Sequence, residues 1–404
     1  MNKRTKTALR RWCLYGWTFV KWTMAASAIG VVCGLIGTMF HFGVHEVTAF
    51  RGTHPWVLYL LPLAGFVIMS FYKLTETDGL GTDDIIDAVH EGKRLPILLL
   101  PAIFFGTVLT HLCGGSAGRE GAALQMGGTI GQCMGRTFRL DDRDLRVATL
   151  AGMAAFFSAL FGTPLAATVF AIMVISIGVI YHVALYPSLL AALVAYGVSV
   201  RLGVEPTRFT VAVPDQSVGM FVRVAALGVL CALVSILFCK LMHGAGHLMK
   251  RIKNPWLRVI CGGFAVITLT WVFGTDYNGA GMDIVTRAIE QETVAVPWAF
   301  LLKLVFTAVT LAAGFKGGEV VPSFFVGATF GCAVSPLLGL PVGFGAAVGL
   351  AAVFCGVTNC PVASTLLAVE LFGAEGMLYF ALACCLSYML SGYQGLYSSQ
   401  TILY

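Results

Sequence analysis

The residues best suited to chemistry lie in two glycine-rich segments, each directly ahead of an apolar run. Residues 114–121 include Arg119 and Glu120, and residues 317–322 include Glu319. A glycine-rich loop that opens a helix leaves backbone N–H groups free at the positive end of the helix dipole, where they bind small anions. A nearby glutamate can occupy those N–H groups when ionised and release them when protonated. The two segments therefore predict an anion site whose occupancy is linked to protons.

Three side chains are candidates for roles at this site, and each has a structural alternative. Glu120 is the candidate gate for proton and anion exchange, or it simply pairs with Arg119. Glu319 is a candidate coupling acid ahead of residues 320–369, which carry no charge, or it caps a helix start. A phenol in residues 391–399, which hold Tyr393 and Tyr397, can donate its O–H to an anion, or it anchors the chain at a membrane interface. Further candidates contribute backbone N–H groups around the anion, namely Gly118, Arg119, Gly121, Gly318, Val320 and Val321.

Composition indicates that these segments lie in a membrane. The 404 residues are 58% hydrophobic and 11% charged, where soluble proteins carry about 25%. No Asp, Glu, Lys or Arg occurs in residues 147–200, 320–369 or 376–404. Each run exceeds the roughly 20 residues of a spanning helix, and glycine and proline divide the two longer runs into several segments. These features predict an all-α, multi-pass membrane protein and exclude an ordinary cytosolic enzyme.

The elements that position the candidate site repeat along the chain. Residues 79–83 (GLGTD) reappear as residues 279–283 (GAGMD), and the same offset of 200 relates Thr107 to Thr307 and Gly118 to Gly318. Residues 163–168 (TPLAAT) match residues 360–365 (CPVAST) with an offset of 197. We therefore expect two transmembrane repeats, over residues 1–202 and 203–404.

The charges of matching loops indicate that the second repeat is inverted. Residues 136–146 hold four arginines, whereas the equivalent residues 339–345 are uncharged; residues 250–253 are basic, whereas residues 48–55 hold only Arg51. Basic loops concentrate on the cytoplasmic side, so matching loops should face opposite sides. Inverted repeats predict a transporter or channel with broken helices meeting at a central site.

The ordered motifs resemble the CLC family of chloride channels and anion/proton antiporters over essentially the whole chain. The family's GREGP motif corresponds to residues 118–122 (GREGA), its GGxFxP motif to residues 317–322 (GGEVVP), and its late tyrosine to Tyr397. The resemblance implies a CLC-type fold, Glu120 as the gating glutamate, Tyr397 as the central-site hydroxyl and a homodimer built around residues 164–195 and 361–388. It also implies that the cytoplasmic CBS domains of many members are absent.

Departures from the chloride pattern look like the CLC-F branch of fluoride/proton antiporters. Leu80 replaces the serine that binds chloride, Met173 and Val174 replace the glutamate pair of chloride/proton antiporters, and Glu319 stands where chloride members are apolar. Val321 stands where fluoride members often carry threonine, which puts the detailed anion ligation in question. The resemblance implies fluoride export in exchange for protons, with chloride/proton antiport or an uncoupled anion channel as alternatives.

Partners and location follow from the same observations. Basic residues cluster ahead of the first apolar run, at positions 3–11, which predicts a cytoplasmic N-terminus in the plasma or cell inner membrane and argues against a nucleic-acid surface. The twelve cysteines show no metal-ligand spacing, so we expect no metal and no cofactor. The expected partners are fluoride and protons, or chloride, together with the lipid bilayer. An intramembrane hydrolase using Ser116 and His111 is the competing class; it lacks a nucleophile elbow and leaves the repeat unexplained, so we expect no enzyme activity.

Overall fold

The computed structural model describes residues 3–291 and 296–402, and these residues are mostly helical. Over the described residues, strands are limited to β1 (Ser176–Ile177) and β2 (Thr401–Ile402), which pair in parallel. The all-α prediction is therefore confirmed. The 3-10 helices η1 (Pro55–Leu60) and η2 (His182–Ala184) precede α2 and α8.

The helices divide into two sets of eight. The first set is α1 (Lys3–Thr53), α2 (Leu61–Leu74), α3 (Thr82–Glu91), α4 (Leu99–Leu112), α5 (Glu120–Thr137), α6 (Asp142–Phe161), α7 (Pro164–Met173) and α8 (Leu185–Arg201). The second set is α9 (Val218–Met249), α10 (Pro255–Phe273), α11 (Met282–Glu290), α12 (Ala299–Ala313), α13 (Val320–Leu338), α14 (Val342–Thr358), α15 (Pro361–Phe372) and α16 (Met377–Ser391). The boundary expected between residues 202 and 203 falls between α8 and α9, and it stays a prediction.

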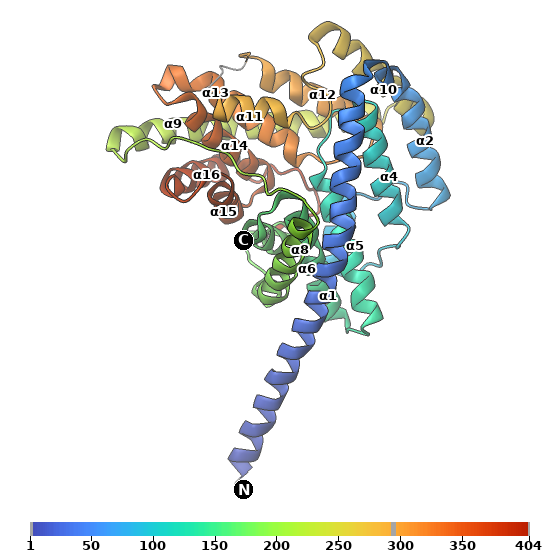
Figure 1. The fold of residues 1–404 in the computed structure, drawn as a ribbon, viewed down its shortest axis with the longest axis vertical. Coiled ribbons are helices and arrows are strands. Elements are labelled where there is room, and N and C mark those ends of the chain that lie inside the picture. The colour runs from blue at the N-terminus through green and yellow to red at the C-terminus, as the bar shows by residue number, and fades with distance from the viewer. Residues whose placement is uncertain (1–2, 292–295, 403–404) are drawn as a thin grey trace.

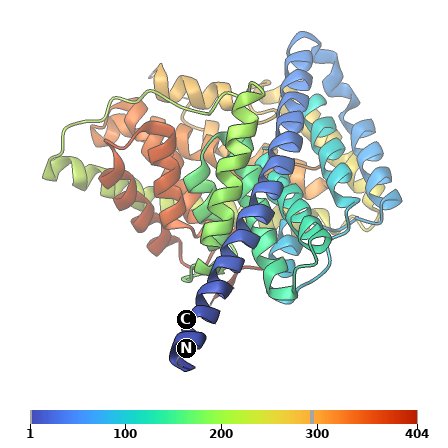
Figure 2. The same ribbon diagram turned by 60° about the horizontal axis from the view of Figure 1, so that its bottom comes forward.

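Several helices are suited to a membrane. Seven helical spans in the described part of the chain are long and apolar enough to cross one, and six shorter apolar helices accompany them. Helix α1 has 51 residues, so at about 1.5 Å per residue it is longer than the roughly 40–45 Å thickness of a bilayer. Its N-terminal part extends away from the other helices (Figures 1 and 2).

Glycines let equivalent helix pairs pack closely in both sets. A Cβ on Gly127 of α5 would collide with the Gly152 carbonyl group of α6, and a Cβ on Gly327 of α13 would collide with that of Gly349 in α14. Only a residue without a side chain allows these backbones to approach so closely. The two collisions lie at equivalent repeat positions, so the sequence repeat is also a repeat of packing.

A pair of reciprocal hydrogen bonds joins the repeats at their centre. Gly118 N–H donates to the Gly318 carbonyl and Gly318 N–H to the Gly118 carbonyl, both at 2.8 Å, as an isolated antiparallel bridge. Ser116 N–H donates to Thr310 Oγ1 at 3.1 Å, and Lys316 N–H donates to Thr110 Oγ1 at 3.2 Å. Every bond pairs with another at an offset of 200, as local two-fold symmetry requires. Helices α5 and α13 begin beside this bridge and share few contacts beyond it, so they diverge from it, as expected for inverted repeats.

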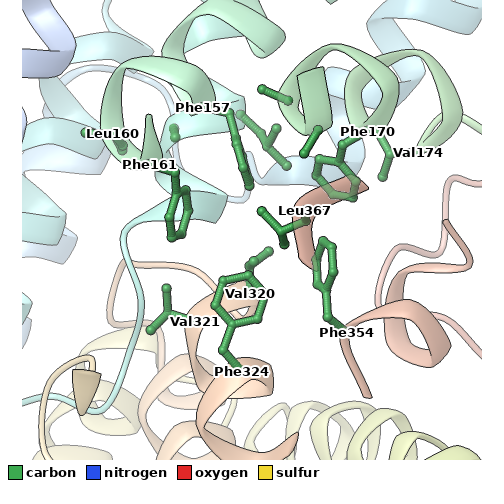
Figure 3. Close-up of a cluster of buried hydrophobic side chains, with 14 of the residues drawn as sticks. Phe157, Leu160, Phe161, Phe170, Val174, Val320, Val321, Phe324, Phe354 and Leu367 are labelled. Atoms are coloured by element: carbon green, nitrogen blue, oxygen red, sulfur yellow. The ribbon is translucent and has the colours of Figure 1, made fainter. Parts of the chain in front are cut away.

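An apolar cluster fills the space beside the bridge (Figure 3). Phe161 of α6 contacts Phe324 of α13 with ring centroids 5.8 Å apart, and Phe170 of α7 contacts Phe354 of α14 at 5.4 Å. Val320 and Val321 project into the same cluster. Aromatic side chains of α6 and α7 from the first repeat therefore pack against those of α13 and α14 from the second, beside the start of α13.

Candidate anion site

Two helix N-termini converge at the centre of the molecule. Helix α5 begins at Glu120 and helix α13 at Val320, each two residues after the glycine of the Gly118–Gly318 bridge. The first N–H groups of a helix have no acceptor within the helix, and the helix dipole places partial positive charge there. The bridge thus brings together two positive helix ends from different repeats, and the anion site expected there stays a prediction.

Glu120 occupies one of these helix ends with its own carboxylate. The residue is 0% exposed, and its Oε2 atom accepts a hydrogen bond from the Arg119 backbone N–H at 2.9 Å. A Cβ on Gly118 would lie 2.6 Å from Oε2, so glycine leaves the room that the carboxylate uses. The Glu120 carboxylate thus occupies a backbone N–H group beside the start of α5, and its role as a gating group stays a prediction.

The guanidinium of Arg119 mostly points away from this position. Its Nη1 lies 3.0 Å from His41 Nδ1 and its Nη2 donates to the Leu160 carbonyl at 3.5 Å, while its Nε is 3.4 Å from Glu120 Oε1. Guanidinium groups only donate, so His41 Nδ1 is the acceptor. Arg119 therefore binds Glu120 Oε2 through its backbone N–H, while its guanidinium pairs only loosely with Glu120 Oε1.

A cavity of about 520 Å³ reaches Glu120 from the end of the molecule where α1 terminates. Val321 also lines it. Its basic lining residues are His41, His45, Arg51, His111, Arg119 and Arg287, and its acids other than Glu120 are Asp276 and Asp283. Three of these basic groups are arginines, which stay charged, so an anion entering the cavity meets guanidinium groups before it reaches the start of α5.

Glu319 lies against the opposite helix end. Its Oε2 is buried, forms no hydrogen bond within the described residues, and lies 3.3 Å from where a Cβ on Gly121 would stand. It therefore faces the first turn of α5 from the repeat that carries α13. A carboxylate left ionised in apolar surroundings without a partner is unfavourable, so this position suits an acid that holds a proton.

Tyr397 and the remaining candidates complete the surroundings. The Tyr397 phenol is buried and its Oη has no hydrogen-bond partner in the described part of the chain. Val320 is 0% exposed and Val321 2%, so these valines have only backbone groups to offer an anion. Leu80 is half-buried and packs against the core.

The alternative hydrolytic pair is not assembled. Ser116 Oγ is hydrogen-bonded to Thr307 Oγ1 at 3.0 Å, and His111 Nδ1 contacts the Thr107 carbonyl at 2.9 Å. His111 Nε2 has no partner within the described residues. The serine and histidine therefore do not form the hydrogen bond that activates a nucleophile.

Metal ligands are not grouped either. Over residues 3–291 and 296–402, no group of three or more His, Cys, Asp or Glu side chains is placed to hold a metal ion.

Two charged residues near the site were not predicted as functional. Lys303 of α12 is 0% exposed, and its Nζ donates to the carbonyls of Gly279 at 2.6 Å and Tyr277 at 3.1 Å. The residue at the equivalent position of the first repeat is Ile103. A lysine where the other repeat has an isoleucine is the sequence feature that could have marked Lys303 as unusual. Asp83 accepts a hydrogen bond from Ser398, which follows Tyr397. Asp83 belongs to the repeated residues 79–83, but this contact joins residues more than 300 positions apart, so the repeat alone did not indicate it.

Comparisons with known proteins identify relatives over nearly the whole chain. The family model described as "Voltage gated chloride channel" matches residues 63–392. A "Chloride/fluoride channel protein" of Pseudomonas syringae pv. tomato is 38% identical over 394 residues, covering 95% of this chain and 86% of that protein. An "H(+)/Cl(-) exchange transporter ClcA" of Vibrio vulnificus is 25% identical over 91% of this chain and 86% of its own length.

Solved structures give the same result for the fold. The crystal structure of a CLC-type fluoride/proton antiporter superposes with a TM-score of 0.93 and 32% identity, covering 96% of this chain and 99% of that one. A slow cyanobacterial Cl⁻/H⁺ antiporter superposes with a TM-score of 0.79 at 18% identity, covering 92% of this chain and 94% of that one, and supports the fold alone.

Proposed function

Because the chain belongs to the CLC family of voltage-gated chloride channels, we propose that it is a secondary transporter that exports fluoride in exchange for protons. The observation that carries this proposal is the Glu120 carboxylate resting on the Arg119 N–H at the start of α5. An acid that competes with an anion for one N–H group links the movement of protons to that of anions. The similarity to a fluoride/proton antiporter at 32% identity, and to a chloride/fluoride channel protein at 38%, supports fluoride as the anion.

The proposed cycle uses the groups around the two helix ends. An ionised Glu120 closes the path by binding the Arg119 N–H. A proton arriving through the basic cavity neutralises the carboxylate and weakens that bond, because a neutral acid accepts less strongly. Fluoride then takes the vacated N–H, and the Tyr397 phenol supplies a second donor. Glu319, buried across from Gly121, receives the proton before it continues to the other side.

The donor set suits fluoride. Fluoride is small and strongly hydrated, so its water must be replaced by close, strong donors such as backbone N–H groups and a phenol. Leu80, an apolar side chain, replaces the serine expected of chloride members. With Met173 and Val174 in place of a glutamate pair, Glu319 is the acid that couples protons to this anion.

The surface of the molecule and the charges at its N-terminus support a homodimer that lies in a membrane. Apolar side chains stay exposed on α7, α8, α15 and α16, including Leu165, Leu193, Val362 and Met389. These exposed side chains fit a homodimer interface in a lipid bilayer. The basic residues at the start of α1 favour a cytoplasmic N-terminus in the plasma or cell inner membrane.

Efflux from proteoliposomes tests the proposal. Purified protein is reconstituted with internal fluoride or chloride, and a pH electrode records proton movement, with protein-free liposomes as the control. Fluoride efflux that drives proton uptake, with slow chloride efflux, is the expected result. Coupled chloride efflux would establish a chloride/proton antiporter, and fast efflux without proton movement would establish a channel.

A further inference from the structure

The segment that carries Tyr397 has no regular structure of its own. Helix α16 ends at Ser391 and β2 begins at Thr401, so residues 392–400 depend on other parts of the chain for their position. The Tyr397 phenol itself forms no hydrogen bond within the described residues. The position of this hydroxyl therefore depends on the packing of the buried Tyr397 ring and on the hydrogen bonds of the neighbouring residues.

Those contacts come from both repeats. On one side of Tyr397, Leu396 N–H donates to the Val357 carbonyl at 2.9 Å. On the other side, Asp83 accepts two bonds with one carboxylate: Oδ2 from Ser398 Oγ at 2.6 Å and Oδ1 from Ser399 N–H at 3.2 Å. Asp83 thus engages the two residues that directly follow Tyr397.

Asp83 also belongs to the loop that carries Leu80. It lies in the first turn of α3, whose N-cap, Gly81, donates its N–H to Asp84 Oδ2 at 2.9 Å. The Leu80 loop is thereby anchored to the start of α3, and the Asp83 carboxylate anchors the Tyr397 segment to the same turn. One helix turn connects two elements that the sequence assigns to the anion path.

We propose that Asp83 is a positioning residue that fixes the Tyr397 phenol for anion binding. The proposal rests on Tyr397 being an anion ligand in the proposed function. The two carboxylate oxygens of Asp83 accept hydrogen bonds from two consecutive residues. The pair of bonds therefore restricts both the rotation of the Tyr397 segment and its distance from α3. A hydrogen bond weakens steeply with distance and angle, so a phenol that shifts loses much of its bond to a bound anion.

The sign of the effect separates positioning from simple electrostatics. Asp83 is an acid within electrostatic range of the Tyr397 phenol, so removing its charge alone should favour a nearby anion and lower the KM for fluoride. Removing its hydrogen bonds should release Tyr397 and raise the KM. Asp83→Asn keeps an acceptor for Ser399 N–H and offers a donor to Ser398 Oγ, whereas Asp83→Ala removes both contacts.

The experiment measures initial fluoride uptake into proteoliposomes with a fluoride electrode. The variants are Asp83→Ala, Asp83→Asn, Tyr397→Phe and the double variant Asp83→Ala/Tyr397→Phe, with Asp87→Ala, one turn further along α3, as the matched control. We expect Asp83→Ala to raise the KM roughly tenfold, in line with the loss of a charge-assisted hydrogen bond. Asp83→Asn keeps the hydrogen bonds and loses the charge, so its KM should equal the wild-type value or fall below it, and Asp87→Ala should stay near wild type. The double variant should be no worse than Tyr397→Phe.

A lowered or unchanged KM in Asp83→Ala would overturn the proposal, as would additive effects in the double variant. If Asp83→Ala does not fold, the exposed residue Ser398 provides a second variant, because Ser398→Ala removes the bond from Ser398 Oγ to Asp83 Oδ2. This variant should raise the KM by a smaller factor, and only when Tyr397 keeps its hydroxyl. An unchanged KM in Ser398→Ala also counts against the proposal. Fluoride uptake is measured without reference to protons. Wild-type uptake without proton movement would therefore refute antiport while leaving the Asp83 comparison intact.

Discussion

Replacing Glu120 should separate its competition with the anion from its role in moving protons. The ionised carboxylate holds the Arg119 N–H at 2.9 Å and is fully buried, so solvent does not screen the bond. A hydrogen bond to a charged group contributes about 1.5–3 kcal/mol and one to a neutral group about 0.5–1.5 kcal/mol. Glu120→Gln keeps a weaker acceptor, a difference of about 1–1.5 kcal/mol, whereas Glu120→Ala removes about 2 kcal/mol of competition.

These energies predict tighter fluoride binding in both variants. The apparent Kd should fall roughly five- to tenfold in Glu120→Gln and roughly thirtyfold in Glu120→Ala. Isothermal titration of fluoride into purified protein measures the Kd, and fluoride-driven proton uptake in liposomes should disappear in both variants. Wild-type proton coupling in Glu120→Gln would refute the gating role, and an unchanged Kd in Glu120→Ala would refute the competition for the N–H.

Two further substitutions test the geometry around the helix ends. Gly318→Ala places a Cβ against the Gly121 backbone, so we expect a loss of about 1–3 kcal/mol of stability and of fluoride transport. Gly244→Ala lies inside α9, where a Cβ meets nothing within 4 Å, so it should keep or slightly raise the melting temperature; equal melting temperatures for the two variants would contradict this packing. Glu319→Gln cannot take up a proton, so fluoride efflux should persist while the number of protons moved per fluoride falls, measured with paired electrodes; an unaltered ratio would exclude Glu319 from the proton path.

The sequence was sufficient for the arrangement of backbone groups at the site. The offset of 200 predicted that Gly118 and Gly318 are equivalent, and the structure joins them by reciprocal hydrogen bonds. The glycine-rich segments at residues 114–121 and 317–322 predicted a helix opening at each, and α5 and α13 begin inside these segments, at Glu120 and Val320. Repeats and helix starts are local or periodic patterns, so a single sequence reveals them.

Side-chain directions could not be predicted in the same way. The Arg119 guanidinium turns to His41, 78 positions earlier in the chain, and no local pattern joins the two. Asp83 meets Ser398 and Ser399 only because the fold brings α3 beside the segment after α16. Lys303 can be buried because two carbonyls of the loop before α11 accept hydrogen bonds from its Nζ, and hydropathy does not reveal such a contact.

The central claim is that fluoride and protons move in opposite directions through one coupled cycle. Its most direct test loads proteoliposomes with fluoride, clamps the membrane potential at zero with potassium and valinomycin, and starts with equal pH on both sides. Our account predicts that outward fluoride flow drives protons into the liposomes and makes their interior acidic. Complete fluoride efflux with no change in pH would contradict it.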